Sequence, residues 1–204
     1  SLYTEQDSAL TKDQIEQYAR SMDSALVSAS IKPAEGGRSW AYCYSTETLL
    51  STTGPKSRAN AIVTVCGGDF FLFHPLKFRY GAPFLNDATI PNGVVIDENL
   101  AWKIFGAIDV VGMTMTIGGE ELTVVGVTEA ERSSEPYTYT YGETARMYMT
   151  YQAYQKTGGA EQCITAYEVT LPNPVRSFAM NIFKNAVSFN EDTTAVLESS
   201  SRYG

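Results

Sequence analysis

Hydrophobic residues recur every three or four positions in two stretches, one near each end of the chain. The first apolar stripe consists of Ile15, Tyr18, Ala19, Met22, Ala25, Leu26 and Ala29. This spacing places the side chains on one face of an amphipathic helix. Thr11 precedes Gln14 by three residues, which is the spacing of a capping box. A proline and paired glycines in residues 31–37 predict where the helix ends.

The second helical stripe consists of Val175, Phe178, Ala179, Ile182, Phe183 and Ala186. Asn173 is the predicted N-cap, and Pro174 occupies the predicted first helical position. The preceding "CITAYEVTLPNP" alternates like a strand, with Tyr167, Val169 and Leu171 on one face. The C-terminal part of the chain therefore predicts a strand followed by a helix.

Between these stretches the pattern predicts a β-hairpin. "RSWAYCYSTET" and "RANAIVTVC" are rich in aromatic and β-branched residues and flank the turn sequence "STTGPKS". If the turn centres on Gly54–Pro55, Cys43 lies opposite Cys66. One alternative is then a cross-strand disulfide, and the other is two small buried side chains, because a register slip of one residue turns a side chain to the other face.

The stretch from Val94 to Val127 predicts a strand, a short helix and a tight hairpin. Asp97 is the expected N-cap of the helix, and Gly106 suits the position after its last turn. Gly118–Gly119 supplies the positive φ angles of a two-residue hairpin turn. A dinucleotide-binding fingerprint needs its glycines between a strand and a helix, so these glycines predict a hairpin and no phosphate site.

The order of elements predicts an α+β fold with two subdomains. The two chain ends, residues 1–75 plus 160–204, would form one helix-on-sheet layer. Residues 76–159 would form an inserted, mixed β-rich subdomain. The aromatic "GGDFFLFHPLKFRYGAPF", which contains His74, is the predicted crossing segment between them.

Composition and charge narrow the class of protein. Hydrophobic residues make up 44% and charged residues 19%, as in a globular domain. A net charge of −8 argues against a nucleic-acid partner. No apolar run approaches the roughly 18–20 residues of a membrane span. The chain starts at Ser1 and not at Met, so we expect it to be a piece of a longer protein.

The sequence predicts no catalytic, cofactor-binding or metal-binding residues. Three cysteines without a C-x-x-C pair and a single histidine argue against a zinc site. There is no Gly-x-Ser-x-Gly motif, and His74 has no carboxylate or cysteine at ligand spacing, so a structural role is favoured for it. The paired carboxylates Glu120–Glu121, Glu129 with Glu131, and Glu191–Asp192 lie in predicted turns and are typical of a solvated acidic surface.

A tyrosine-rich stretch supplies the one candidate contact surface. Tyr137, Tyr139 and Tyr141 alternate, so all three share one face of any strand. Such a face can stack on sugars or anchor a protein partner. The favoured alternative is a half-buried strand face.

Four motifs in order resemble the extracytoplasmic (periplasmic core) domain of MacB-type ABC transporter permeases. They are "GGDFFLF", "YGAPF", "VVIDENLAWKIFG" and "VVGMTMTIGGEELTVVGV". The sequence departs from the family pattern at Ala82, where arginine is frequent, and at Thr150, where proline is common. The motifs cover the middle of the chain, and the two ends match by architecture.

The resemblance implies a domain strung between two membrane helices of a permease, outside the membrane, with a porter-like layer and a β-rich insertion. It implies that ATP is hydrolysed by a separate ATP-binding subunit, that the permease is a dimer, and that an adaptor, or a substrate protein or peptide, is a further partner. Function would lie in linked movement of the whole domain. The alternative is a secreted or cell-surface ligand- or carbohydrate-binding module that uses the tyrosines.

Overall fold

The computed structural model describes residues 1–32, 37–84, 90–130, 145–188 and 192–198. Within these residues the chain forms two compact units. Unit 1 comprises Ser1–Thr46, Gly68–Phe70 and Glu161–Gly204, and unit 2 comprises Glu47–Gly67 and Phe71–Ala160.

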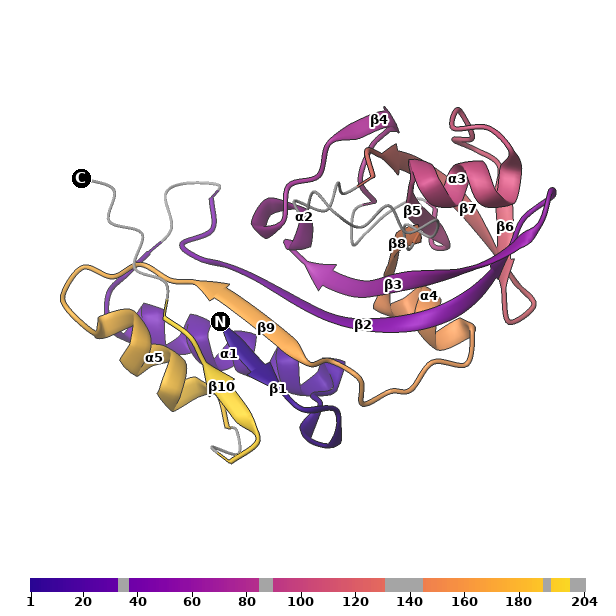
Figure 1. Cartoon of the computed structure of the whole chain (residues 1–204). Coiled ribbons are helices and arrows are strands. Elements are labelled where there is room, and N and C mark those ends of the chain that lie inside the picture. The colour runs from indigo at the N-terminus through magenta and orange to yellow at the C-terminus, as the bar shows by residue number, and fades with distance from the viewer. Residues whose placement is uncertain (33–36, 85–89, 131–144, 189–191, 199–204) are drawn as a thin grey trace, which may run out of the picture. The chain divides into compact units, whose positions relative to one another are not determined.

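Unit 1 is an antiparallel sheet covered by two helices. Its elements, in chain order, are β1 (Leu2–Thr4), the 3₁₀ helix η1 (Gln6–Ser8), α1 (Lys12–Ser28), the first part of β2 (Ala41–Thr53), β9 (Ala166–Thr170), α5 (Phe178–Ala186) and β10 (Thr194–Val196). The strand order is β10-β1-β9-β2, with antiparallel pairs β1–β10, β1–β9 and β2–β9. A β-α-β-β-α-β chain with this strand order is a ferredoxin-like, split βαβ arrangement. Figure 1 shows α1 and α5 running side by side.

Aromatic side chains fill the core of unit 1. Tyr167 on β9 is fully buried, and its ring contacts Tyr18 of α1 and Phe183 of α5 at centroid distances of 6.2 and 6.3 Å. Both helices therefore pack on the same face of the sheet. The Tyr167 hydroxyl is buried and has no hydrogen-bond partner among the described residues.

The two helices of unit 1 begin in different ways. The predicted capping box of α1 is confirmed, because Thr11 accepts from the N–H of Gln14 and the Gln14 side chain accepts from the N–H of Thr11. The predicted start of the second helix at Asn173–Pro174 is wrong, because α5 begins at Phe178. The Asn173 side chain still accepts from the N–H of Ala179, at 3.1 Å, and so caps the helix from outside it.

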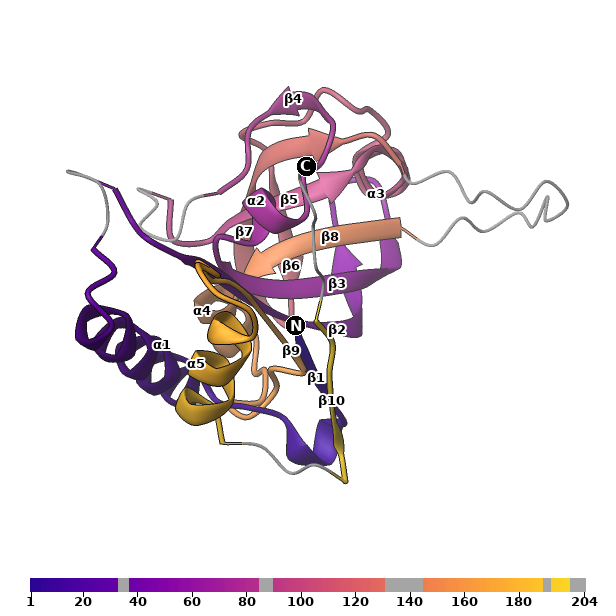
Figure 2. The same ribbon diagram turned by 90° about the vertical axis from the view of Figure 1, so that its left-hand side faces the viewer.

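Unit 2 is built around a closed ring of strands. Its remaining strands are β3 (Arg58–Gly68), β4 (Phe78–Gly81), β5 (Gly93–Asp97), β6 (Thr114–Ile117), β7 (Glu120–Thr128) and β8 (Ala145–Thr150). The pairing path runs β2-β3-β8-β5-β7, β6 pairs with β7, and Thr53 of β2 pairs with Thr116 of β6. Within the described residues these pairings close a six-stranded barrel, with β4 outside it on β7. Pairs β3–β8 and β5–β7 are parallel, so the sheet is mixed (Figure 2).

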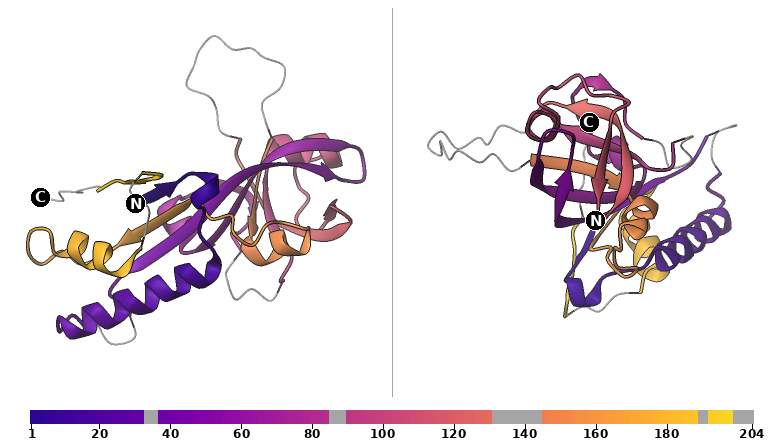
Figure 3. Two further views of the ribbon diagram at one scale, coloured as in Figure 1. Left: turned by 90° about the horizontal axis from the view of Figure 1, so that it is seen from below. Right: turned by 90° about the vertical axis from the view of Figure 1, so that its right-hand side faces the viewer.

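Three short helices accompany the barrel: α2 (Phe70–Phe73), whose first residue belongs to unit 1, α3 (Glu98–Phe105) and α4 (Tyr151–Lys156). Figure 3 shows the long ribbons of β2 and β3 from two further sides. The barrel core contains three fully buried methionines, Met115, Met147 and Met149. The mixed α+β class expected from the sequence is confirmed.

The stretch from Val94 to Val127 folds as predicted, into a strand, a short helix and a hairpin. Asp97 caps α3 by accepting from the N–H of Leu100 at 2.7 Å, and Gly106 ends the helix at φ 80°. Gly118 and Gly119 both have positive φ, 58° and 87°, as a two-residue hairpin turn requires. These glycines make a turn between β6 and β7.

The tip of the β2–β3 hairpin docks on the end of α3. The backbone N–H of Lys56 and the hydroxyl of Ser57 donate to the terminal carbonyls of Ile104 and Lys103. The Lys56 ammonium also lies 5.5 Å from the centre of the Trp102 ring. A cation at a helix C-terminus is favourable, so the tip satisfies both the carbonyls and the helix dipole. β2 extends to Thr53, beyond the predicted start of the turn.

Candidate functional site

The tyrosines singled out from the sequence, Tyr137, Tyr139 and Tyr141, lie outside the described residues. Two tyrosines just after them, Tyr148 on β8 and Tyr151 at the start of α4, are buried. These two belong to the core of unit 2. The predicted contact role of the other three stays a prediction.

Residues on both sides of 131–144 are held at the start of α3. Glu98 accepts from the N–H of Ala130 at 3.2 Å. Asp97 accepts from the backbone N–H of Arg146. Two adjacent carboxylates therefore hold the end of β7 and the start of β8, because the parallel pair β5–β7 and the antiparallel pair β5–β8 bring both to the carboxyl end of β5.

Charges of both signs surround this turn. The Arg79 guanidinium lies 3.5 Å from Glu98 and 3.7 Å from Glu129. Arg146 lies 3.3 Å from Glu47. The sequence identified Asp97 only as the cap of a helix. Nothing in the spacing of Arg79 or Arg146 indicated that the sheet would bring them here.

Burial dominates the electrostatics of Asp97. Its side chain is 3% exposed, and this desolvation raises the pKa of its carboxyl from 3.8 to about 6. The N–H groups of Leu100 and Arg146 act in the opposite direction, as do the charges of Lys103 and Arg146. Asp97 thus changes charge near pH 6.

A cavity of about 200 Å³ opens beside Asp97. Its lining combines Asp97 and Glu129 with Lys77 and Arg146, together with Pro75, Leu76, Thr128, Ala130 and Tyr148. These groups can donate and accept hydrogen bonds, and they can form ion pairs with cationic or anionic groups of a ligand.

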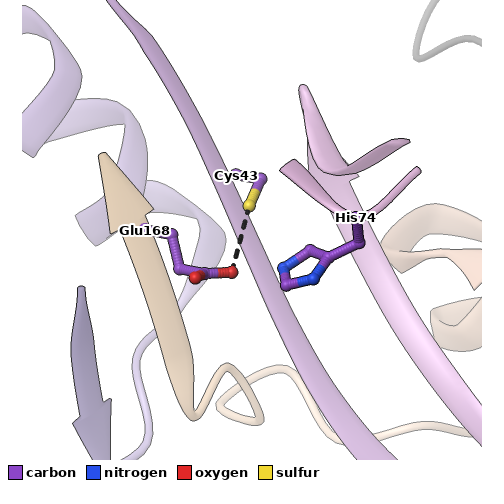
Figure 4. Close-up of side chains that lie close together, drawn as sticks. All are labelled: Cys43, His74 and Glu168. Atoms are coloured by element: carbon purple, nitrogen blue, oxygen red, sulfur yellow. Dashed lines mark hydrogen bonds between the residues drawn. The ribbon is translucent and has the colours of Figure 1, made fainter. Parts of the chain in front are cut away.

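Unit 1 presents a carboxylate on the face of its sheet opposite Tyr167. Glu168 of β9 accepts from the hydroxyls of Ser1 and Tyr3, each at 3.3 Å, and from the thiol of Cys43 at 3.5 Å (Figure 4). Glu168 raises the pKa of Tyr3, after the larger effect of burial. Within unit 1, Cys43 and Glu168 supply one thiol and one carboxylate that could each serve as a metal ligand. His74, also labelled in Figure 4, belongs to unit 2.

The thiols settle the alternative that the sequence left open. Cys43, Cys66 and Cys163 are all buried, and none of them forms a disulfide. Burial raises the pKa of the Cys163 thiol to about 11 and that of Cys66 further. A disulfide between Cys43 and Cys66 is therefore absent, and the two residues are small buried side chains.

Unit 1 contains a second, uncharged cavity of about 370 Å³, beside η1 and β10. It is lined by Leu2, Thr4, Ser8, Ala9, Leu10, Gln14, Gln162, Ser188 and Thr194. Some of its polar groups bond to one another: the Thr194 hydroxyl donates to that of Thr4 at 3.2 Å, and Gln162 donates to the carbonyl of Ala9 at 2.7 Å. These bonds fasten β10 and η1 to the rest of unit 1.

No helix in the described ranges is long and apolar enough to cross a membrane.

Two solved structures with this fold are extracytoplasmic domains of transporters. The extracellular domain of the noncanonic ABC-type transporter YknZ from Gram-positive bacteria has a TM-score of 0.63 at 11% identity, covering 97% of this chain and 98% of that one. The periplasmic region of MacB from Actinobacillus actinomycetemcomitans has a TM-score of 0.58 at 14% identity, covering 91% and 78%. At these identities the likeness establishes the fold.

The sequence itself establishes the family. Residues 5–181 match the MacB-like periplasmic core domain, so the chain belongs to that family. A comparison with curated proteins finds no match. The resemblance identified from the four motifs is confirmed, and the chain is a MacB-like periplasmic domain of the kind found in ABC-type transporter permeases.

Proposed function

We propose that this chain is the extracytoplasmic domain of an ABC transporter permease, and that it couples ATP hydrolysis on the cytoplasmic side to the movement or export of a substrate outside the membrane. The family match over residues 5–181 carries the proposal. ATP would be bound and hydrolysed by a separate nucleotide-binding subunit or domain. The domain described here would contribute no catalytic residue.

The pairing of the two chain ends supports this role. The N–H of Ser1 donates to the carbonyl of Leu197 at 2.7 Å, and the N–H of Leu197 donates back to Ser1 at 2.8 Å. Leu2 pairs with Val196 on adjacent antiparallel strands. Ser1 and Leu197 therefore lie side by side in unit 1, an arrangement that suits attachment to two neighbouring membrane helices.

A domain attached in this way moves when its two flanking helices move. ATP shifts a permease between states because it binds them with different affinity. The domain outside would follow as packed, rigid bodies, through hinge or shear motion. Packed aromatic and barrel cores such as those of units 1 and 2 suit this task, since a well-packed interior transmits strain.

The proposal extends to partners and location. The domain would lie on the outer face of the cytoplasmic membrane, tethered by transmembrane helices on both sides. The intact permease would be a dimer and would bind its ATP-binding subunit, with an adaptor or a substrate protein or peptide as a further partner. Tyr137, Tyr139 and Tyr141 are the residues we propose for such a contact.

The coding sequence on either side of this chain gives the first test. One apolar segment of membrane length before Ser1 and three after Gly204 are expected. A secretion signal alone upstream, with a stop codon or a wall-anchoring signal just downstream, would refute the permease assignment and favour a cell-surface binding module.

A further inference from the structure

The cavity beside Asp97 lies entirely within unit 2. All of its lining residues belong to the segment Phe71–Ala160 of that unit. Its volume is about 200 Å³, whereas pockets that bind drug-sized molecules measure about 300–1,000 Å³. A ligand that fits here is therefore a small molecule. The chemistry of the lining then decides which class of small molecule it can bind.

The register of three strands places polar side chains of the lining in one row. Asp97 of β5 pairs with Thr128 of β7. On the other side of β5, Ile96 pairs with Met147 of β8, so the next antiparallel pair sets Asp97 beside Arg146. Paired residues of neighbouring strands point to the same face of a sheet. Arg146, Asp97 and Thr128 therefore follow one another across that face.

Exposure separates the base of the cavity from its opening. Asp97 and Thr128 are each 3% exposed, so they form the base. Lys77 and Glu129 are exposed, and they come from neighbouring backbone positions, because the N–H of Glu129 donates to the carbonyl of Lys77 at 2.9 Å. A buried carboxylate and a buried hydroxyl thus lie beneath an exposed ammonium and an exposed carboxylate.

The cations of the lining can receive an anionic group of a ligand. The Lys77 ammonium forms no ion pair with the residues that the structure describes. The Arg146 side chain is 30% exposed and lies 3.3 Å from the Glu47 carboxylate, and it adds a second positive charge to the lining. A planar guanidinium with five N–H donors suits recognition of a carboxylate. Lys77 and Arg146 therefore favour a carboxylate on the ligand.

The Asp97 carboxylate at the base favours a cationic group. An ionised carboxylate has about four acceptor positions, and the N–H groups of Leu100 and Arg146 occupy two of those of Asp97. Burial raises the pKa of Asp97 to about 6, even though the charges of Lys103 and Arg146 act to lower it. The cations of the protein therefore do not fully replace the water that Asp97 loses on folding. A ligand ammonium, with three N–H donors, would supply both charge and hydrogen bonds, and Glu129 would be a second acceptor.

The lining also includes an apolar wall, formed by Pro75, Leu76 and Tyr148. Tyr148 is 7% exposed, and its ring packs edge-on against that of Phe71 at 6.1 Å between ring centroids. The Tyr148 ring is therefore held in place before a ligand arrives, so little side-chain freedom is lost on binding. Such a wall suits an apolar side chain of few atoms.

We propose that this cavity is a binding site for a small zwitterion, a free α-amino acid with an apolar side chain. The carboxylate of the ligand pairs with Lys77 beside Arg146. Its ammonium donates to Asp97 and Glu129, and its side chain lies against the apolar wall. A ligand with one charge only would meet two side chains of its own sign, whereas a zwitterion meets partners for both of its groups. The site is a property of this chain and does not rest on the proposed function.

A chemical-shift titration of the isotope-labelled chain with L-valine tests the site directly. The amino acid is added up to about 10 mM, tenfold above a Kd of about 1 mM. Saturable shifts are expected at the backbone amides of Lys77, Asp97 and Glu129. N-acetyl-L-valine lacks the ammonium, and L-valinamide lacks the carboxylate. Each should bind at least about tenfold more weakly than L-valine, the factor expected when a hydrogen bond between charged groups is lost.

Two substitutions locate the ligand within the cavity. Asp97→Asn keeps an equally good helix cap but removes the charge, and it should weaken the binding of L-valine by about tenfold or more. Lys77→Gln removes an exposed ammonium and should weaken binding about two- to fivefold, the range of an exposed ion pair. The matched control is Lys156→Gln, which removes another exposed lysine of unit 2 from outside the lining and should leave the affinity unchanged.

Two results would overturn the proposal. One is the absence of saturable shifts at these amides when L-valine is added. The other is equal binding of L-valine and either blocked analogue, because the site would then recognise a single charge. Since no membrane, nucleotide or ATP-binding subunit is present in the titration, neither result bears on the proposed coupling to ATP hydrolysis.

Discussion

Asp97 should make unit 2 more stable at pH 5 than at pH 7.5. Burial raises the pKa of this carboxyl to about 6 in the folded chain, against 3.8 when it is free of the fold. The folded state therefore binds the proton more tightly than the unfolded state. The stabilising contribution is fully present below pH 3.8 and is lost as the pH rises through about 6.

The magnitude follows from these two values. A shift of about 2 pH units corresponds to roughly 3 kcal/mol when fully developed, since one unit is about 1.4 kcal/mol. At pH 5 the unfolded carboxyl is largely ionised and the folded one largely protonated, which gives about 1.4 kcal/mol. At pH 7.5 both are ionised and the contribution is close to zero.

The substitution Asp97→Asn isolates this effect, because asparagine is as good an N-cap as aspartate and does not titrate. Asp97→Ser is a second cap of the same kind. The free energy of unfolding is measured in urea at pH 5 and pH 7.5, with Trp102 on α3 as the probe. The wild type should gain about 1.4 kcal/mol relative to both variants on going from pH 7.5 to pH 5. A wild type whose pH dependence runs parallel to that of both variants would refute the assignment of a raised pKa to Asp97.

Two further substitutions test the packing. Gly54→Ala should lower the free energy of unfolding, measured in a urea titration, by about 1–3 kcal/mol. The Cβ of the alanine would lie 2.5 Å from the carbonyl oxygen of Ile104, where the hairpin tip meets α3. An unchanged free energy of unfolding would contradict this docking. Tyr167→Phe should raise the melting temperature, because it removes a buried hydroxyl that has no hydrogen-bond partner among the described residues. The expected gain in the free energy of unfolding is about 1 kcal/mol. Its control is Tyr18→Phe, which removes the 2.7 Å hydrogen bond to the carbonyl of Ser188 and should lower the melting temperature; equal shifts in both variants would contradict the assignment.

Local features of the fold were predictable because their causes are local. The capping box at Thr11, the cap at Asp97 and the Gly118–Gly119 turn each depend on residues within four positions of one another. The start of α5 was mispredicted because Asn173 has the chemistry of a cap but acts on Ala179 across an irregular turn. Sequence spacing does not show such a turn.

Long-range features could not be predicted from spacing. The closure of the barrel depends on one pair, Thr53 with Thr116, in strands far apart in the sequence. The charged group at the start of α3 depends on strand pairings that bring Arg79 and Arg146 to Asp97 and Glu98. Pairing of this kind is set by register and topology, which a single sequence specifies only weakly.

Movement of this domain with the nucleotide state of a permease can be observed as a change of distance in the intact permease in lipid nanodiscs. Val27 of α1 is 63% exposed, whereas the three cysteines of this chain are 2% exposed or less, so within this chain a spin label would attach selectively at Val27→Cys. Any other accessible cysteine of the permease is replaced by serine. The distance between the labels of the two protomers is measured by pulsed electron paramagnetic resonance without nucleotide and with a non-hydrolysable ATP analogue. Two different distance distributions are expected if the domain moves with the nucleotide state. One unchanged distribution, in a preparation that hydrolyses ATP, would contradict it.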